Sequence, residues 1–147
     1  MLPGADERIG DEIVSSHVRS LLGNHVVDVE SSDQHTVKPW FSGKVDFSPP
    51  VRDFEAEGFP LVGGRLDYID HRPAAALVYK RAQHTINVFA LAAPAGTRDA
   101  SPRASSMRGL NTLRWTRDGM AFWAVSDVAA EDLARLVALL RGAEAPR

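Results

Sequence analysis

The sequence predicts an α+β fold: an antiparallel β meander of about five strands, with an N-terminal and a C-terminal helix packed on one face. Apolar residues recur at steps of three and four near both ends of the chain, which is the period of amphipathic helices. Between these two regions the apolar period changes to two, as in half-buried strands. Helices that flank an antiparallel meander are expected to cover one face of the sheet.

The first predicted element is a helix over roughly residues 6–29. Its predicted buried stripe consists of Val14, Val18, Leu21, Leu22 and His25. Gly23 lies inside this pattern and costs about 1 kcal/mol relative to alanine in a helix, so the pattern is strongest before it. We therefore expect His25 to be buried in the core and to bind no metal.

The segment after this helix is predicted to be irregular. Residues 31–35 are polar, and residues 36–41 are expected to be extended because Pro39 disfavours helical geometry at Lys38.

Alternation of apolar and polar residues predicts strands over about residues 59–69, 74–81, 84–92, 109–117 and 119–126. Asp118 and Gly119 lie between the last two strands and indicate a hairpin, because a type I′ turn needs positive φ at both central positions. A closing helix over about residues 128–141 has an apolar stripe at helical spacing. Residues 94–109 are rich in Pro, Gly and Ser, and we expect a flexible loop that trypsin cuts first.

Composition limits the protein to one ordinary domain. The chain has 147 residues, of which 44% are hydrophobic and 24% charged, with a formal net charge of −2. It contains no cysteine, which excludes thiol catalysis, disulfides and Cys-ligated zinc. No apolar run approaches the roughly 20 residues that span a bilayer, and the first residues lack signal-peptide features. The chain as written is therefore expected to be soluble.

Charge differs between the two halves of the sequence. Residues 1–70 hold 6 Lys and Arg against 13 Asp and Glu, whereas residues 71–147 hold 11 against 6. We expect the two halves to lie against each other, and we expect no direct contact with nucleic acid because the basic residues lack interleaved aromatic side chains.

Common catalytic motifs are absent. The pair Gly43-Lys44 lacks the remainder of a P-loop, and Gly58, Gly63 and Gly64 have the wrong spacing for a dinucleotide-binding fingerprint. The serine-hydrolase elbow G-x-S-x-G is also missing. The sequence therefore predicts no catalytic residue.

The histidines of the first predicted helix do not have the spacing of a metal site. His17 and His25 lie eight positions apart, whereas helix-borne ligand pairs lie four positions apart. His35 could join either histidine from the following segment, with Asp33 as a third ligand. We expect no metal and no cofactor.

The predicted ligand-binding residues are Asp33, His35, Lys38 and Trp40. Polar, charged and aromatic residues gather in this short segment, which is expected to be a loop, and binding residues concentrate on loops. The alternative is that the same residues stabilise the fold.

Several segments resemble a family of bacterial membrane-anchored anti-sigma factors, also described as transmembrane transcriptional regulators. These segments are residues 31–51 (SSDQHTVKPWFSGKVDFSPPV), 58–68 (GFPLVGGRLDY), 78–81 (VYKR), 84–89 (HTINVF), 113–115 (LRW), 119–120 (GM) and 123–127 (WAVSD). The resemblance covers most of residues 14–140.

The resemblance implies a parent protein of three parts: a cytoplasmic segment that sequesters an extracytoplasmic-function sigma factor, one transmembrane helix, and an outer domain. The chain looks like the outer domain alone, on the periplasmic side of the inner membrane. It is expected to be a non-enzymatic sensory or interaction domain that reads an unknown periplasmic signal and can form a homodimer. Two alternatives stay open: a His-dependent metal- or haem-sensing domain, and a small hydrolase.

Overall fold

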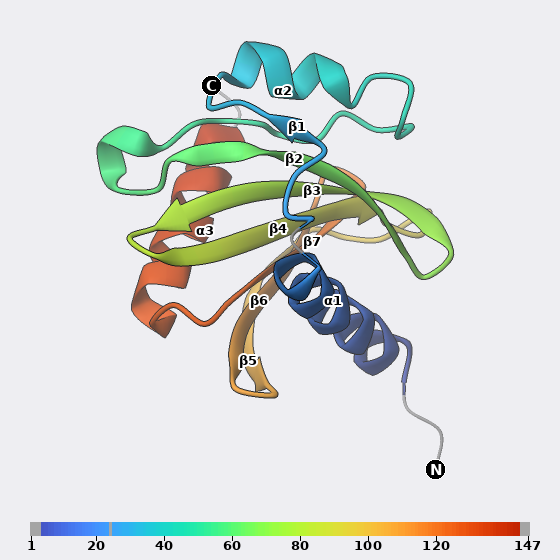
Figure 1. Cartoon of the computed structure of the whole chain (residues 1–147). Coiled ribbons are helices and arrows are strands. Elements are labelled where there is room, and N and C mark those ends of the chain that lie inside the picture. Colours follow the sequence, from blue (N-terminus) through green and yellow to red (C-terminus); the bar gives the residue numbers. More distant parts are fainter. Residues whose placement is uncertain (1–3, 24, 145–147) are drawn as a thin grey trace.

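The computed structural model describes residues 4–23 and 25–144. A seven-stranded antiparallel sheet has the order β1-β2-β3-β4-β7-β6-β5 (Figure 1). The strands are β1 Val29–Glu30, β2 Leu61–Ile69, β3 Arg72–Arg81, β4 His84–Ala92, β5 Ala100–Met107, β6 Leu110–Arg117 and β7 Met120–Ser126. The helices are α1 Ala5–Leu22, α2 Gln34–Trp40, the 3-10 turn η1 Glu55–Glu57, and α3 Ala130–Glu144. The predicted α+β class is confirmed, with two more strands than expected.

The hairpin between β6 and β7 forms as predicted. Asp118 and Gly119 have φ angles of 51° and 78°, as a type I′ turn requires. The strands on either side pair in register from Arg117 opposite Met120 to Asn111 opposite Ser126.

The two terminal helices lie on opposite faces of the sheet, so the prediction that they share one face is wrong. One core cluster joins α2 and α3 to side chains such as Leu77 and Val88, and the other joins α1 to Phe89 and Val125. Figure 1 shows α1 in front of the sheet and α3 behind it. The reason is that neighbouring positions such as Val88 and Phe89 are both apolar, so both faces of the central strands require cover.

Helix α1 ends at Leu22, earlier than predicted, and buries a different face. Gly23 stops the helix, and its N–H donates to the carbonyl groups of Arg19 and Leu21. Among the described positions of α1, the buried ones are Gly10, Ile13, Val14, Ser16, His17 and Ser20. Val18, Leu21 and Leu22 are instead 36%, 44% and 83% exposed.

The prediction that His25 belongs to the core is also wrong. His25 lies beyond the end of α1 with an exposed side chain, and His17 occupies the buried position in its place. The physical reason is the sheet surface below α1, which carries polar side chains that select the polar positions of the helix.

Residues 34–40 form the short helix α2, not the extended segment predicted over residues 36–41. The side chain of Asp33 caps the helix by accepting from the His35 N–H at 2.8 Å. Pro39 lies in the last turn, where it removes the bond that an N–H at this position would donate to the His35 carbonyl. Val37 and Phe41 are buried against the sheet, and this packing favours the helix over an extended chain.

The predicted loop over residues 94–109 contains the edge strand β5. Its residues 100–107 pair with β6 and are mostly exposed. The strand consists mainly of Ser, Ala and Arg because an exposed edge needs no apolar face, and the pairing with β6 supplies its order. The expectation of a continuous loop is therefore wrong. No helix among the described residues combines the length and apolar character needed to cross a bilayer.

Candidate functional site

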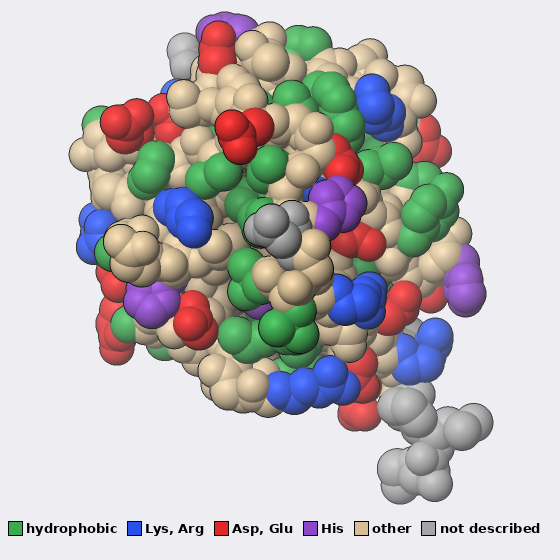
Figure 2. Space-filling view, viewed as in Figure 1, with side chains coloured by type: hydrophobic (Ala, Val, Ile, Leu, Met, Phe, Trp, Pro, Cys, Tyr) green, Lys and Arg blue, Asp and Glu red, His purple; other side chains and the backbone are tan. Residues whose placement is uncertain are grey.

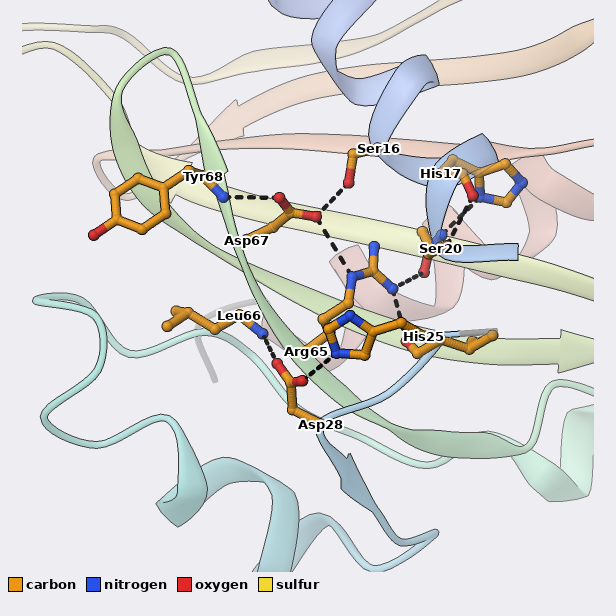
Figure 3. A network of polar contacts seen from close by, with 11 residues as sticks. Ser16, His17, Ser20, His25, Asp28, Arg65, Leu66, Asp67 and Tyr68 are labelled. Carbon is orange, nitrogen blue, oxygen red and sulfur yellow. Dashed lines mark hydrogen bonds and ion pairs between the residues drawn. The ribbon is translucent and has the colours of Figure 1, made fainter. Parts of the chain in front are cut away.

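Polar side chains gather between α1 and the sheet, where an apolar contact would be usual. We call this set the Arg65 network, and Figure 3 shows most of it. It consists of Ser16, His17 and Ser20 from α1, His25, Val26 and Asp28 from the following segment, Arg65, Leu66 and Asp67 from β2, and Asn87 from β4.

Arg65 is the centre of the network and is only 2% exposed. Its Nη1 donates to the Val26 carbonyl at 2.7 Å and to Asn87 Oδ1 at 3.4 Å, and its Nε donates to Asp67 Oδ2 at 3.4 Å. The guanidinium also lies 5.7 Å from the centre of the Phe89 ring. Burial lowers the pKa of Arg65, and Asp67 opposes that effect. Arginine keeps its charge even so, because its normal pKa lies far above neutrality.

One nitrogen of this buried cation lacks a hydrogen-bond partner. Arg65 Nη2 is covered and forms no hydrogen bond with any of the residues that the structure describes. In Figure 3 it is the Arg65 nitrogen without a dashed line, and it points toward α1. An unsatisfied buried donor costs roughly 1–3 kcal/mol, and more when the group is charged. With α1 docked on the sheet, one donor of the buried Arg65 guanidinium is therefore left without a hydrogen bond.

Asp67 links α1 to Arg65. Its Oδ2 accepts from the Ser16 hydroxyl and from Arg65 Nε, and its Oδ1 accepts from the Tyr68 N–H at 2.8 Å. One carboxylate thus contacts the helix and the buried cation at once. Loss of this carboxylate would release both contacts.

His17 and Asn87 form the second link between α1 and the sheet. Asn87 Oδ1 accepts from Arg65, so Asn87 Nδ2 donates to His17 Nδ1 at 2.7 Å. Burial, followed by the positive charge of Arg65, lowers the pKa of His17 to about 4, although Asp127 opposes this effect. His17 is therefore neutral at physiological pH, with Nδ1 unprotonated.

The segment after α1 is anchored separately. His25 Nε2 lies 2.5 Å from Asp28 Oδ1, and Asp28 Oδ2 accepts from the Leu66 N–H at 2.8 Å. Partial burial raises the pKa of Asp28, but the hydrogen bonds from His25 and Leu66 outweigh that effect and lower it overall. These contacts hold the chain against β2 directly after the helix.

The network holds a helix in place but is not arranged as a catalytic triad. Ser16 donates to Asp67 and Ser20 donates to the His17 carbonyl, so neither hydroxyl is hydrogen-bonded to the histidine ring. A hollow of about 170 Å³ adjoins the network beside Arg19 and His25. Across the part of the chain that the structure describes, no three His, Cys, Asp or Glu side chains form a metal-binding group.

The four predicted site residues lie on or beside α2, on the opposite face of the sheet. Asp33 is the helix cap, and His35 is exposed. Lys38 Nζ donates to the Pro49 carbonyl at 3.2 Å and borders a hollow of about 350 Å³. Trp40 packs edge-on against Phe41 with ring centres 5.1 Å apart. The structure thus gives three of the four residues contacts that stabilise the local fold.

Sequence reasoning missed the residues of the Arg65 network. The signal was weak but present: Arg65 interrupts an apolar strand, and Asn87 stands between Ile86 and Val88. Asn87 is polar but fully buried. Only the strand pairing and the position of α1 bring these residues to His17.

The outer surface over α1 mixes charges of both signs. Figure 2 shows basic and acidic side chains interspersed with apolar ones across the described part of this face. Phosphate-backbone recognition is typically made by a clustered stripe of basic residues, and the described side chains in this view form no such stripe.

Neither a scan of protein-family models nor a search of curated proteins finds a match to this chain. The segments that carry the anti-sigma resemblance can still be placed in the fold. Residues 58–68 include Arg65 and Asp67, and residues 84–89 include Asn87. The resembling segments therefore supply the part of the Arg65 network that lies on the sheet.

Proposed function

We propose that this chain is the non-enzymatic outer domain of a transmembrane anti-sigma factor that regulates an extracytoplasmic-function sigma factor. Two findings support the proposal: the resemblance, and the location of Arg65, Asp67 and Asn87 within the resembling segments. In this proposal the domain lies on the periplasmic side of the inner membrane. It reaches the sigma factor only through a cytoplasmic part of the parent protein, and its membrane contact is made by a transmembrane helix before residue 6.

The observation that carries the proposal is the way α1 is held. Ser16 and His17 attach the helix to Asp67 and Asn87, and both contacts converge on Arg65, whose Nη2 has no partner among the described residues. Helix α1 also buries Ile13 and Val14 in an apolar cluster, and the unsatisfied donor of Arg65 lowers the stability of this docked position, which narrows the free-energy gap to a released position. In the proposed architecture α1 connects the domain to the transmembrane helix. A signal therefore acts by changing the free-energy difference between docked and released α1.

The test uses the full-length gene with a sigma-dependent reporter in its bacterial host. Deleting residues 31–147 while keeping the membrane helix should abolish or alter the stimulus-dependent release of the sigma factor. A matched control carries the exposed substitution Arg52→Ala and should respond like the wild type. An unchanged response in the deletion strain, at equal protein level, would refute the sensory role.

The claim of catalytic inertness is tested separately. Purified domain incubated with general esterase, phosphatase and peptidase substrates should show no turnover above the buffer rate. Turnover that follows the domain through purification and is lost in a Ser16→Ala variant would establish the hydrolase alternative instead.

A further inference from the structure

Helix α1 covers only part of its face of the sheet, and the remaining part is hollowed. Two adjoining hollows of about 210 and 340 Å³ lie over β6 and β7. They share three lining residues, Arg103, Arg114 and Trp123, and so form one groove, which we call the β5 groove. The larger hollow is at the lower end of the roughly 300–1,000 Å³ of small-molecule sites.

The floor of the β5 groove combines apolar and cationic groups. Trp123 from β7 contributes to both hollows, and the Arg114 guanidinium lies 5.5 Å from the centre of its ring. Arg98 and Arg103 line the wall formed by β5 and the segment before it. Among the side chains that the structure describes, Glu7 of α1 is the single acidic one that lines either hollow. The groove therefore favours a ligand with an apolar body and a negative group.

Arg98 and Arg103 differ from neighbouring arginines in having no counter-ion within the part of the chain that the structure describes. Arg108 pairs with Asp11 at 3.6 Å, and Arg117 pairs with Asp118 at 4.0 Å. Among the described residues, no carboxylate lies within ion-pair distance of Arg98 or Arg103. Both side chains are exposed, so a bound anion can reach them without breaking an existing contact.

We propose that the β5 groove binds a small apolar carboxylate, with its carboxylate at Arg98 and Arg103 and its apolar body on Trp123. Arginine suits this role because its planar fork can donate two parallel hydrogen bonds to a carboxylate. A purely polar anion would leave the apolar floor without a partner, and a neutral apolar molecule would leave both cations without one. Charge complementarity and the apolar floor together define the ligand class.

The groove is continuous with the contact surface of α1. A Cβ added to Gly10 of α1 would lie 2.7 Å from Met107 Cε and 3.3 Å from Trp123 Cη2. The helix thus packs directly on two residues that line the groove. Occupancy of the groove can therefore change the docking of α1, and this link to signalling rests on the proposed function, whereas the binding itself does not.

The test is calorimetric titration of the purified chain with naphthylacetate and with decanoate. Naphthylacetamide, which lacks the negative charge, is the matched neutral probe. We expect saturable binding of at least one carboxylate and at least tenfold weaker binding of the amide. The affinity for the carboxylate should fall as the salt concentration is raised. The carboxylate that binds more tightly shows whether the groove prefers an aromatic or a straight-chain apolar body.

Variants locate the binding site. The double variant Arg98→Ala/Arg103→Ala should weaken carboxylate binding at least tenfold, whereas Arg52→Ala should stay within twofold of the wild type. Absence of binding by both carboxylates, equal binding of the amide, or an equal loss in Arg52→Ala would each overturn the proposal. If binding fails while the deletion of residues 31–147 still changes the reporter, the groove is excluded and the sensory function stands.

Discussion

Asn87 on β4 donates a hydrogen bond to the Nδ1 atom of His17 on α1, across a distance of 2.7 Å. The two residues are 70 positions apart in the sequence, and both are almost completely buried. The bond requires an unprotonated His17 Nδ1, because Asn87 presents an N–H group to it. Protonation of this one atom therefore opposes the docking of α1 on the sheet.

The first prediction concerns pH. The pKa of His17 is about 4 in the folded chain and 6.5 in the unfolded chain, so the unfolded chain binds more protons between these values. The contribution of neutral, buried His17 to the free energy of unfolding is complete above about pH 6.5. It is lost as the pH falls toward 4, by about 3 kcal/mol in total. We expect denaturant unfolding to show this loss, and the His17→Gln variant to show a flatter pH profile.

The control for this experiment is His35→Gln, whose side chain is exposed. This variant should keep the wild-type profile between pH 7 and pH 4.5. Identical profiles for wild type and His17→Gln would show that another group causes the pH dependence.

The second prediction concerns the buried cation. Arg65→Ala leaves the Asp67 carboxylate without its cation and the Val26 carbonyl without its donor. Removing one partner of a buried charge pair typically costs about 3–5 kcal/mol of unfolding free energy. The exposed Arg52→Ala should change that free energy by less than about 0.5 kcal/mol. A loss below about 1 kcal/mol for Arg65→Ala would contradict the central role of this residue.

The third prediction concerns the approach of β1 to β2. A Cβ at position 63 would lie 2.0 Å from the Val29 carbonyl oxygen, so Gly63→Ala must displace β1. We expect unfolding free energy to fall by more than about 2 kcal/mol, in the range of severe steric changes. Gly142→Ala in α3 meets no atom within 4 Å and should instead stabilise the fold by roughly 0.5–1 kcal/mol. Equal effects of the two substitutions would show that β1 is not held as described.

The fourth prediction concerns limited proteolysis. Arg98 lies in an exposed segment between β4 and β5, whereas Arg103 belongs to the paired strand β5. Trypsin should therefore cut first after Arg98, because cleavage needs locally unpaired backbone. Arg98→Gln should slow the first cut, as followed by mass spectrometry. A first cut within residues 61–92 would show that the segment before β5 is better protected than the central strands.

The class of fold could be predicted because its signals are local. Alternating residues marked β2 to β4, and the turn residues Asp118 and Gly119 marked the β6–β7 hairpin. Strand β5 escaped prediction because an exposed edge strand needs no apolar face. Its order comes from pairing with β6, which local sequence does not reveal.

The buried face of α1 could not be predicted because it depends on distant residues. The apolar pattern placed Val18 and Leu22 toward the core, but Arg65 and Asn87 make the sheet surface below α1 partly polar. Polar helix positions such as His17 are buried there as a result. The predicted site near Trp40 was chosen by residue type alone, whereas the Arg65 network is assembled from four separate parts of the chain.

The central claim is that the outer domain acts through the docking of α1. The most direct measurement compares Asp67→Ala with Leu136→Ala in the full-length protein, using the sigma-dependent reporter at equal protein levels. Asp67→Ala removes the carboxylate that holds Ser16, whereas Leu136→Ala weakens the core on the opposite face. The account predicts that Asp67→Ala changes basal sigma activity severalfold while Leu136→Ala leaves it near the wild-type value. Equal responses of the two variants, or no response to Asp67→Ala, would contradict it.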